Sequence, residues 1–284
     1  MTRVNDNSGT EREGPVIVVT GIGGMGLAIA RRLGSRSTLV LADVKEAALS
    51  SAAEELRGEG YDVVEQVTDV SDEKSVAALA DVASNLGRVD VLAHTAGLSP
   101  VQAPVDAILR VDLRGTALML DAFASVIAPG GAGVFIASMA GTMHPHDADL
   151  DTRLATTPTA DLLDLPELSA SIITDPGTAY MIAKRANQAR VRTGALVWGR
   201  RGARVNSISP GIIATPMGNL ELGGPSGEVM RALVAGSPTG RVGTPHDIAS
   251  AVEFLVGPQS SFITGTDLLV DGGVVASILT GQTS

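Results

Sequence analysis

The sequence predicts an α/β domain of the doubly wound, Rossmann type, built on a seven-stranded parallel sheet. Short β-branched runs alternate with longer segments rich in alanine and leucine, which is the pattern of repeated βαβ units. The strand-like runs are apolar almost throughout, as strands buried on both faces of a parallel sheet require. A chain of 284 residues also has a length that an α/β fold commonly fills with one domain.

The expected strands are spaced so that a helix fits between each pair. We place them at residues 16–20, 38–42, 62–66, 89–94, 133–138, 204–209 and 267–270. Helices are expected to begin near Met25, Glu46, Ser75, Pro104, Thr178 and Pro245. Residues 142–176 interrupt this rhythm as an insertion. The domain is therefore expected to span 15–284, after a polar extension, 1–14, that is expected to be disordered.

The composition excludes several functional classes. A net charge of −10 and only seven aromatic residues argue against binding of nucleic acid. The chain has no cysteine, and its four histidines form no ligand motif, so we expect no metal. No apolar stretch has the length of a membrane span, and the first residues do not resemble a signal peptide, so a cytoplasmic protein is expected.

A glycine-rich turn directly follows the first expected strand. Its glycines have the spacing of the dinucleotide fingerprint, between a strand and a helix. Main-chain N–H groups and the helix N-terminus are expected to bind a pyrophosphate there. The expected contact residues are Gly21, Gly23, Gly24, Met25 and Gly26. A glycine turn that serves packing alone is the alternative.

An acidic residue, Asp43, ends the second expected strand about 20 residues after the turn. Its carboxylate is expected to accept hydrogen bonds from the adenosine ribose of NAD. A 2′-phosphate there would be repelled by up to about 4 kcal/mol at about 4 Å, so NAD is favoured over NADP. Lys45 would soften this preference if it faced the phosphate, but a solvated surface lysine is the more common outcome.

Tyr180 and Lys184 lie four residues apart, which places both side chains on one face of a helix. A phenol titrates near ~10, so a base acting near neutrality needs a pKa lower by roughly 3, equivalent to about 4 kcal/mol. An ammonium group at about 4 Å supplies about that energy at an effective dielectric of about 20. The pair is therefore predicted to perform acid/base chemistry, with an ordinary core tyrosine as the alternative.

These motifs together resemble the short-chain dehydrogenase/reductase family over residues 15–273. Asp69-Val70 resembles the family's adenine contact, and His94-Thr95-Ala96-Gly97 takes the place of its Asn-Asn-Ala-Gly. Residues 206–215 resemble its loop on the nicotinamide side. The cofactor contacts that the resemblance adds are Asp69, Val70, Ala96, Gly97, Tyr180, Lys184, Pro210, Gly211, Ile213 and Thr215.

The resemblance implies hydride transfer between NAD and a secondary alcohol or ketone. Tyr180 is expected to move the hydroxyl proton. Lys184 is expected to lower the pKa of Tyr180 and to bind the nicotinamide ribose. Ser138, at the end of a central strand, is expected to hydrogen-bond the substrate oxygen. A strand-end hydroxyl without a catalytic role is the alternative for Ser138.

Two departures from the family pattern affect this site. Asp112 stands where the family usually has an asparagine whose backbone carbonyl holds a relay water. The main-chain role survives, so Asp112 stays among the expected catalytic residues. Its carboxylate is nevertheless expected to raise the pKa of Lys184 and to cancel part of the lysine's field. His94 and Thr95, in place of asparagines, are expected to support the strand without a catalytic role.

The insertion separates Ser138 from Tyr180 by more residues than is common in the family. It predicts either a helical lid or a reshaped subunit interface, and its apolar residues could line one side of short helices. These residues are Leu150, Leu154, Leu162, Leu165, Ile172 and Ile173. Met217, Leu220 and Leu222 are expected to form the opposite wall.

The long insertion resembles the bacterial 3α-hydroxysteroid dehydrogenase/carbonyl reductase branch of the family. This resemblance implies a hydrophobic substrate, steroid-like or a bulky carbonyl compound, and the family implies a homodimer or homotetramer. Two other functions stay open. A 3-oxoacyl-thioester reductase uses the same frame but normally prefers NADPH. A catalytically silent NAD-binding regulator is the other, although the presence of Ser138, Tyr180 and Lys184 together argues against it.

Overall fold

A computed structural model describes residues 14–145 and 147–281, in which seven parallel strands form one sheet. Its order is β3-β2-β1-β4-β5-β6-β7, so the strand order reverses between β1 and β4. The strands are β1 Val16–Thr20, β2 Thr38–Asp43, β3 Asp62–Val67, β4 Val89–His94, β5 Ile127–Ile136, β6 Arg204–Pro210 and β7 Asp267–Val270. The predicted fold class is confirmed. A ligand is expected outside the carboxyl ends of the strands at the reversal.

The β5 strand departs most from the prediction. It begins at Ile127, where an irregular register against β4 accommodates Gly130 with a φ of 84°. It ends at Ile136, two residues earlier than expected, because Ser138 instead caps the next helix. The hydroxyl of Ser138 is thereby fixed just beyond the end of a central strand.

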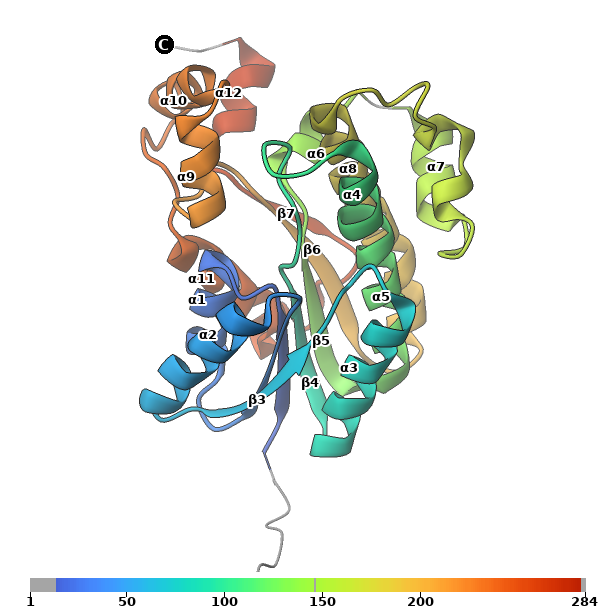
Figure 1. The fold of residues 1–284 in the computed structure, drawn as a ribbon, viewed down its shortest axis with the longest axis vertical. Coiled ribbons are helices and arrows are strands. Elements are labelled where there is room, and N and C mark those ends of the chain that lie inside the picture. The colour runs from blue at the N-terminus through green and yellow to red at the C-terminus, as the bar shows by residue number, and fades with distance from the viewer. Residues whose placement is uncertain (1–13, 146, 282–284) are drawn as a thin grey trace, which may run out of the picture.

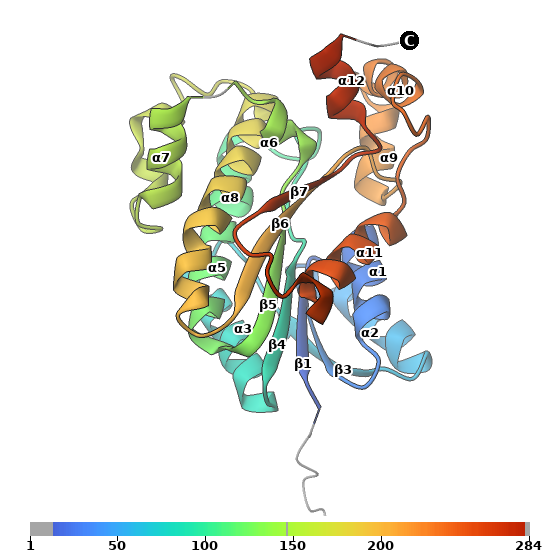
Figure 2. The ribbon, with the colours of Figure 1, turned by 180° about the vertical axis from the view of Figure 1, so that it is seen from behind.

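Helices cover both faces of the sheet (Figures 1 and 2). One face carries α1 Gly24–Leu33, α2 Glu46–Gly58 and α11 Pro245–Val256, and the other carries α3 Glu73–Leu86, α5 Thr116–Val126 and α8 Pro176–Gly199. Local sequence fixes where several of them begin. Asp175 accepts a hydrogen bond from the Thr178 N–H ahead of α8, and Thr244 forms a capping box with Asp247 ahead of α11.

The helix expected from Pro104 contains a widened turn. The short helix α4 Val105–Ile108 passes through a π-helical segment, Leu109–Gly115, into α5. Such segments are rare and are frequent at functional sites. This one carries Asp112, which is fully buried.

The insertion forms a packed layer on the outer side of α8. It begins at the end of α6 Met139–Met143 and comprises α7 Ala148–Thr156 and two 3₁₀ turns, Leu162–Asp164 and Pro166–Leu168. Leu154, Leu162 and Ile173 are buried in a third core shared with α8 and the π-helical segment, whereas Ile172 is 60% exposed. Arg190 donates hydrogen bonds to the carbonyl oxygens of Leu154 and Thr157. The leucines predicted to line a lid are therefore committed to this core.

The remaining helices stand at the carboxyl end of the sheet, on the other side from α7 (Figure 1). They are α9 Pro216–Gly223, α10 Gly227–Ala235 and α12 Val274–Thr280, with a 3₁₀ turn at Pro258–Ser260 following α11. Within the described ranges, no helix is long and apolar enough to cross a membrane. The predicted disordered extension lies outside the described residues, except for Gly14.

Candidate active site

The surroundings of each fingerprint glycine in the turn after β1 show why a side chain is absent there. Gly21 has a φ of 81°, and a Cβ there would lie 2.5 Å from the backbone nitrogen of Ala96. A Cβ on Gly26 would lie 2.1 Å from the Gly21 carbonyl oxygen, so a side chain would separate the helix from the turn. Gly23 faces open space with no atom within 4 Å. A pyrophosphate fits this arrangement, because its close approach needs the room that Gly23 leaves.

The start of α1 is available to such a ligand. Gly23 is its N-cap residue and supplies no side-chain hydrogen bond to the first turn. The first helical N–H groups are therefore left for an anion. Thr215, the N-cap residue of α9, stands beside them, since its methyl carbon lies 3.0 Å from the Cβ position of Gly24.

Asp43 is held rigidly at the end of β2. One carboxylate oxygen accepts from the Ile22 N–H at 2.8 Å and the other from the Lys45 N–H at 2.9 Å. The acid is thus attached to the glycine-rich turn itself, where the prediction places the adenosine ribose. The Lys45 side chain is exposed, as expected for a solvated lysine.

The other predicted cofactor residues follow the carboxyl ends of their strands. Asp69 accepts two hydrogen bonds from Ser71, and Val70 is buried. Ile213 is buried in the core beside α11, so its backbone is what remains for a ligand. Gly211 allows a close approach, because a Cβ there would lie 2.6 Å from the Asp271 Cα atom.

Ser138, Tyr180 and Lys184 meet beyond the end of β5. The Ser138 hydroxyl oxygen accepts from the Ala140 N–H at 3.1 Å, and its hydrogen bond to Tyr180 favours the phenolate. The Lys184 Nζ atom lies 5.3 Å from the centre of the Tyr180 ring and 3.4 Å from the Ile136 carbonyl oxygen. The structure therefore brings the three predicted side chains together.

Asp112 lies directly behind this group. Its Oδ2 atom is 3.3 Å from Lys184 Nζ, and its Oδ1 atom accepts from the Leu98 N–H at 2.8 Å. Gly97 covers the pair, because a Cβ at that position would lie 3.3 Å from both Asp112 Oδ2 and Lys184 Nζ. The predicted proximity of the carboxylate to the lysine is present in the structure.

The backbone carbonyl of Asp112 already accepts two hydrogen bonds. The Thr116 hydroxyl donates to it at 2.8 Å and the Asn187 amide at 2.9 Å. A carbonyl oxygen has two lone pairs, so a relay water at this atom would have to displace one of these donors. The sequence pointed to neither Thr116 nor Asn187.

The charges at the site shift three pKa values. Burial raises the pKa of Asp112, and the positive charge of Lys184 lowers it by less, so the net shift is upward. Burial lowers the pKa of Lys184, but the Asp112 carboxylate and Tyr180 outweigh it and the net shift is upward. Burial also raises the pKa of Tyr180, and Lys184 only partly offsets it. The expected lowering by the lysine is therefore present but outweighed, with Asp112 adding to the rise.

His94 is part of a buried hydrogen-bonded chain behind Asp112. Its Nδ1 atom lies 2.7 Å from the Thr20 hydroxyl and its Nε2 atom 3.3 Å from that of Thr116. Because Thr116 donates to the Asp112 carbonyl, Nε2 carries the proton and Nδ1 accepts from Thr20. Burial, helped by Lys184, lowers the pKa of His94 to about 3. A neutral histidine that holds neighbouring segments together agrees with the structural role expected for His94.

The wall formed by α9 differs from the prediction. Leu220 turns outward and is 58% exposed, whereas Glu221 turns inward and its charge raises the pKa of Tyr180. Burial raises the pKa of Glu221, and the neighbouring Ser99 hydroxyl opposes that rise. No motif singled out Glu221 or Ser99. A glycine within a short helix indicates a face that packs closely, and Glu221 lies on the face of Gly218 because it follows that buried glycine by three residues.

No cluster of histidine, aspartate or glutamate side chains among residues 14–145 and 147–281 is arranged to hold a metal ion. The polar groups at the end of β5 are instead a hydroxyl, a phenol and an ammonium group. Such a set can donate hydrogen bonds to an oxygen atom and exchange a proton with it.

Family models match both halves of the chain. Residues 15–148 match a model described as short chain dehydrogenase, and residues 153–275 match one described as enoyl-(acyl carrier protein) reductase. A short-chain dehydrogenase/reductase of Alternaria brassicicola is 41% identical over 92% of this chain and 95% of its own length.

Two bacterial relatives are similar at lower identity. The D-threitol dehydrogenase of Mycolicibacterium smegmatis is 30% identical over 92% of this chain and 93% of its own length. The 3β-hydroxysteroid dehydrogenase 1 of Eggerthella lenta is also 30% identical, over 92% of this chain and 94% of its own length.

Solved structures share the fold. A dehydrogenase/reductase from Sinorhizobium meliloti matches with a TM-score of 0.74 and 26% identity, over 92% of this chain and 95% of the other. A blue fluorescent protein from a metagenomic library, in complex with NADPH, matches with a TM-score of 0.72 and 25% identity, over 93% and 99% of the two chains.

Proposed function

The chain belongs to the short-chain dehydrogenase/reductase family of oxidoreductases that act on CH–OH groups, and we propose that it uses NAD to interconvert a secondary alcohol and a ketone. One observation carries the proposal. Ser138, Tyr180 and Lys184 converge at the carboxyl end of β5, on the same edge of the sheet as the glycine-rich turn.

Each of the three side chains has a distinct role in the proposal. The Ser138 oxygen accepts from a backbone N–H, so the hydroxyl has one hydrogen to donate, and in the proposal this hydrogen turns from Tyr180 to the substrate oxygen when the substrate binds. Tyr180 gives a proton to that oxygen during reduction and takes it during oxidation. Lys184 stabilises the phenolate by its charge. When bound beside them, the nicotinamide supplies or accepts the hydride.

The raised pKa of Tyr180 bears on the direction of reaction. A tyrosine that stays protonated near neutrality is ready to act as an acid, which is the role that ketone reduction requires. Alcohol oxidation requires the phenolate, whose population grows as the pH rises toward the pKa. The proposed enzyme is therefore better prepared for reduction near neutral pH and for oxidation in alkaline solution.

NAD rather than NADP is the proposed cofactor because of Asp43. Both of its carboxylate oxygens are held by backbone N–H groups, so the charge is fixed where a 2′-phosphate would lie. The solved neighbour that holds NADPH shows that the fold can also accept a phosphorylated cofactor. Calorimetric titration with NADH and NADPH tests the preference. Equal affinities, unaltered by Asp43→Asn, would contradict it.

For the substrate we propose a hydrophobic secondary alcohol or ketone, of the steroid-like or bulky kind. Leu98 and Tyr180 are both partly buried and both pack against the core that the insertion shares with α8. The 3β-hydroxysteroid dehydrogenase supports this class, whereas the D-threitol dehydrogenase, at the same identity, is named for a polyol. A panel of steroid, alicyclic and short polyol substrates tests the proposal, and turnover of polyols alone would contradict it.

A reductase of acyl thioesters is the second candidate. The match of residues 153–275 to the family model of enoyl-(acyl carrier protein) reductases favours it, while the net charge of −10 disfavours docking of an acidic carrier protein. Acetoacetyl thioesters therefore belong in the same panel. Tight binding of NADH without turnover of any compound would favour the silent regulator instead.

The arrangement of copies and the location of the protein are further proposals. Phe262 beside β7 is fully exposed and Phe254 on α11 is 44% exposed, so we propose that copies associate as a homodimer or homotetramer. Light scattering that shows a monomer at working concentration would contradict this. The cytoplasmic location and the division into an extension, 1–14, and one domain, 15–284, stay predictions.

A further inference from the structure

A group of buried polar side chains lies between α8 and the strands β6 and β7. Asp267 is the first residue of β7 and pairs in the sheet with Ser207 of β6. One of its carboxylate oxygens accepts from the hydroxyl groups of Ser207 at 2.6 Å and Ser209 at 3.0 Å. Both serines are fully buried. The hydrogen of the Ser209 hydroxyl is therefore directed to Asp267, and its oxygen is left to accept a hydrogen bond.

Gln188 of α8 completes this group. It is buried, and it follows Lys184 by four residues, so the two side chains lie on one face of the helix. Its Nε2 atom lies 2.8 Å from the Ser209 hydroxyl oxygen and 3.3 Å from the second carboxylate oxygen of Asp267. A carboxylate only accepts hydrogen bonds, so the amide nitrogen, and not the amide oxygen, faces the strands. The direction of each hydrogen bond in the group is thereby fixed.

The same nitrogen also reaches the segment that carries Ser138. It lies 3.1 Å from the hydroxyl oxygen of Thr142 in α6 and 3.5 Å from the carbonyl oxygen of Ser138. The helix α6 rests directly on α8, because a Cβ on Gly141 would lie 2.7 Å from the carbonyl carbon of Lys184. Gln188 therefore contacts α6 on one side and the end of β6 on the other.

These two neighbours of Gln188 carry different parts of the proposed reaction centre. Ser138 directly precedes α6 and is proposed to donate to the substrate oxygen. Ser209 stands near the end of β6, directly before residues 210–211 of the loop that is proposed to contact the nicotinamide. The separation between the substrate oxygen and the nicotinamide therefore depends on how α6 is held against the end of β6.

We propose that Gln188 is a positioning residue, which sets the distance between Ser138 and the nicotinamide by joining α6 to the end of β6. This inference rests on the proposed function and adds a residue to it. Gln188 reaches the main chain at Ser138 and the hydroxyl of Thr142, so it acts through the placement of Ser138. Placement matters because the reacting atoms must lie about 3–3.5 Å apart, and a misplacement of about 1 Å costs up to about 100-fold in rate.

The test measures reduction of cyclohexanone by NADH in Gln188→Leu, alone and combined with Ser138→Ala. Gln188→Leu keeps an apolar side chain of similar size without a donor and is expected to lower kcat by about tenfold to 100-fold. The affinity for NADH, measured by calorimetry, is expected to change little. In the Ser138→Ala protein the same change is expected to lower kcat by less than about twofold, because no hydroxyl is left to place. Gln259→Leu, at an exposed glutamine after α11, is the matched control and is expected to change nothing.

Gln188→Glu provides a readout that packing alone does not move. The new carboxyl group lies beside that of Asp267, and two carboxyl groups this close do not both ionise, so one pKa is raised. Below the raised pKa the new group keeps a proton and donates it as the amide does, whereas above that pKa it has no hydrogen to donate. The kcat of this variant, relative to the unaltered protein, is therefore expected to be highest in acid and to fall toward that of Gln188→Leu as the pH rises.

Equal losses from Gln188→Leu with and without Ser138→Ala would overturn the inference, because they would show that the amide supports the fold in general. A Gln188→Leu protein with full kcat would also overturn it, as would a Gln188→Glu protein whose relative kcat does not change with pH. If Gln188→Leu does not fold, the pH comparison carries the test. Failure of the proposed function looks different, because Tyr180→Phe and Ser138→Ala then leave kcat unchanged.

Discussion

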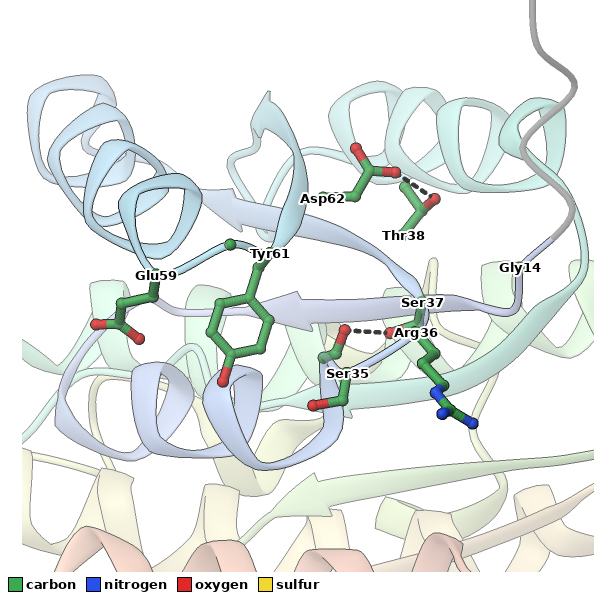
Figure 3. Close-up of a pocket in the computed structure, with 10 residues that line it drawn as sticks. Gly14, Ser35, Arg36, Ser37, Thr38, Glu59, Tyr61 and Asp62 are labelled. Atoms are coloured by element: carbon green, nitrogen blue, oxygen red, sulfur yellow. Dashed lines mark hydrogen bonds between the residues drawn. The ribbon is translucent and has the colours of Figure 1, made fainter.

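The two ends of the parallel sheet differ in how their polar side chains are hydrogen-bonded. At the amino ends of β1, β2 and β3 lies a cleft of about 560 Å³, lined by residues such as Ser35, Arg36 and Tyr61 (Figure 3). Two of its polar pairs are hydrogen-bonded within the protein: Thr38 donates to Asp62 at 2.8 Å and Tyr61 donates to the Arg31 carbonyl at 2.9 Å.

The carboxyl end holds most of the unpaired groups. Four buried side-chain atoms of the described residues lack a hydrogen-bond partner, and three of them are on Ser99, Asp112 and Asn187. The Asp112 atom keeps an ion pair with Lys184 Nζ at 3.3 Å, and Asn187 is attached to Asp112 through the hydrogen bond to its carbonyl oxygen. The fourth is on Glu167 in the insertion. Leaving a buried polar group unpaired costs about 1–3 kcal/mol, so a fold retains such groups mainly where a ligand or a reaction uses them. Unpaired polarity, and not hollow volume, marks the proposed active site.

The largest expected effect belongs to the carboxyl end. We expect Tyr180→Phe to lower kcat for ketone reduction by about 10³-fold or more, because the variant has no proton to give. Binding of NADH, measured by calorimetry, is expected to change little. Turnover within tenfold of the unaltered protein would show that Tyr180 is only a packing residue.

The buried chain at His94 gives the next effect, on stability. The unfolded histidine takes up a proton below about pH 6.5, while the folded one stays neutral down to about 3. The free energy of unfolding is therefore expected to fall as the pH drops from 6.5, by up to about 1.4 kcal/mol per pH unit from this group. Denaturant titrations from pH 7 to 4 measure this slope.

A variant separates the histidine from other groups that titrate in acid. His94→Asn is expected to flatten the slope, whatever it does to stability at pH 7. His246→Asn, at an exposed histidine of α11, is the matched control and is expected to leave the slope unchanged. An identical slope in all three proteins would mean that His94 is protonated in the folded state.

Asp112 allows a smaller and more specific test. Its carboxylate raises the pKa of Tyr180, so Asp112→Asn is expected to lower that pKa and to move the pH profile of alcohol oxidation toward lower pH. Oxidation at neutral pH should then rise several-fold. The amide can still accept from the Leu98 N–H, which the pairing at 2.8 Å requires. A profile that does not move would mean that Asp112 is already protonated when the enzyme works.

Substitutions at the amino end of the sheet are expected to have the smallest effect. Thr38→Val removes a hydrogen bond in the cleft and is expected to cost about 1 kcal/mol of stability or less, with kcat and KM unchanged. Thermal denaturation and turnover assays check both expectations. A large loss of activity would contradict the distinction between the two ends of the sheet, because it would show that the cleft takes part in the reaction.

Local sequence patterns predict most of the strands of this protein. The strand bounds agree with prediction to within one or two residues except at β5, where the bulge around Gly130 brings in residues that hydrophobic periodicity does not mark as strand. The spacing of Tyr180 and Lys184 predicts that the two side chains share a helix face. That Ser138 joins them is what the family resemblance implies, because the spacing along the chain does not bring a strand end to that helix.

Other features depend on contacts between segments far apart in the sequence. The sequence does not show that Thr116 and Asn187 occupy the Asp112 carbonyl, that the insertion packs on α8, or that Glu221 is partly buried while Leu220 is exposed. Hydropathy alone places the leucine inside. The opposite outcome arises because the inward face of a short helix is set by the segments it bridges, here the glycine-rich turn and the loop at Val101. Local periodicity determined the frame and its reactive groups, and packing between distant segments decided which lone pairs, charges and hydroxyls face the substrate.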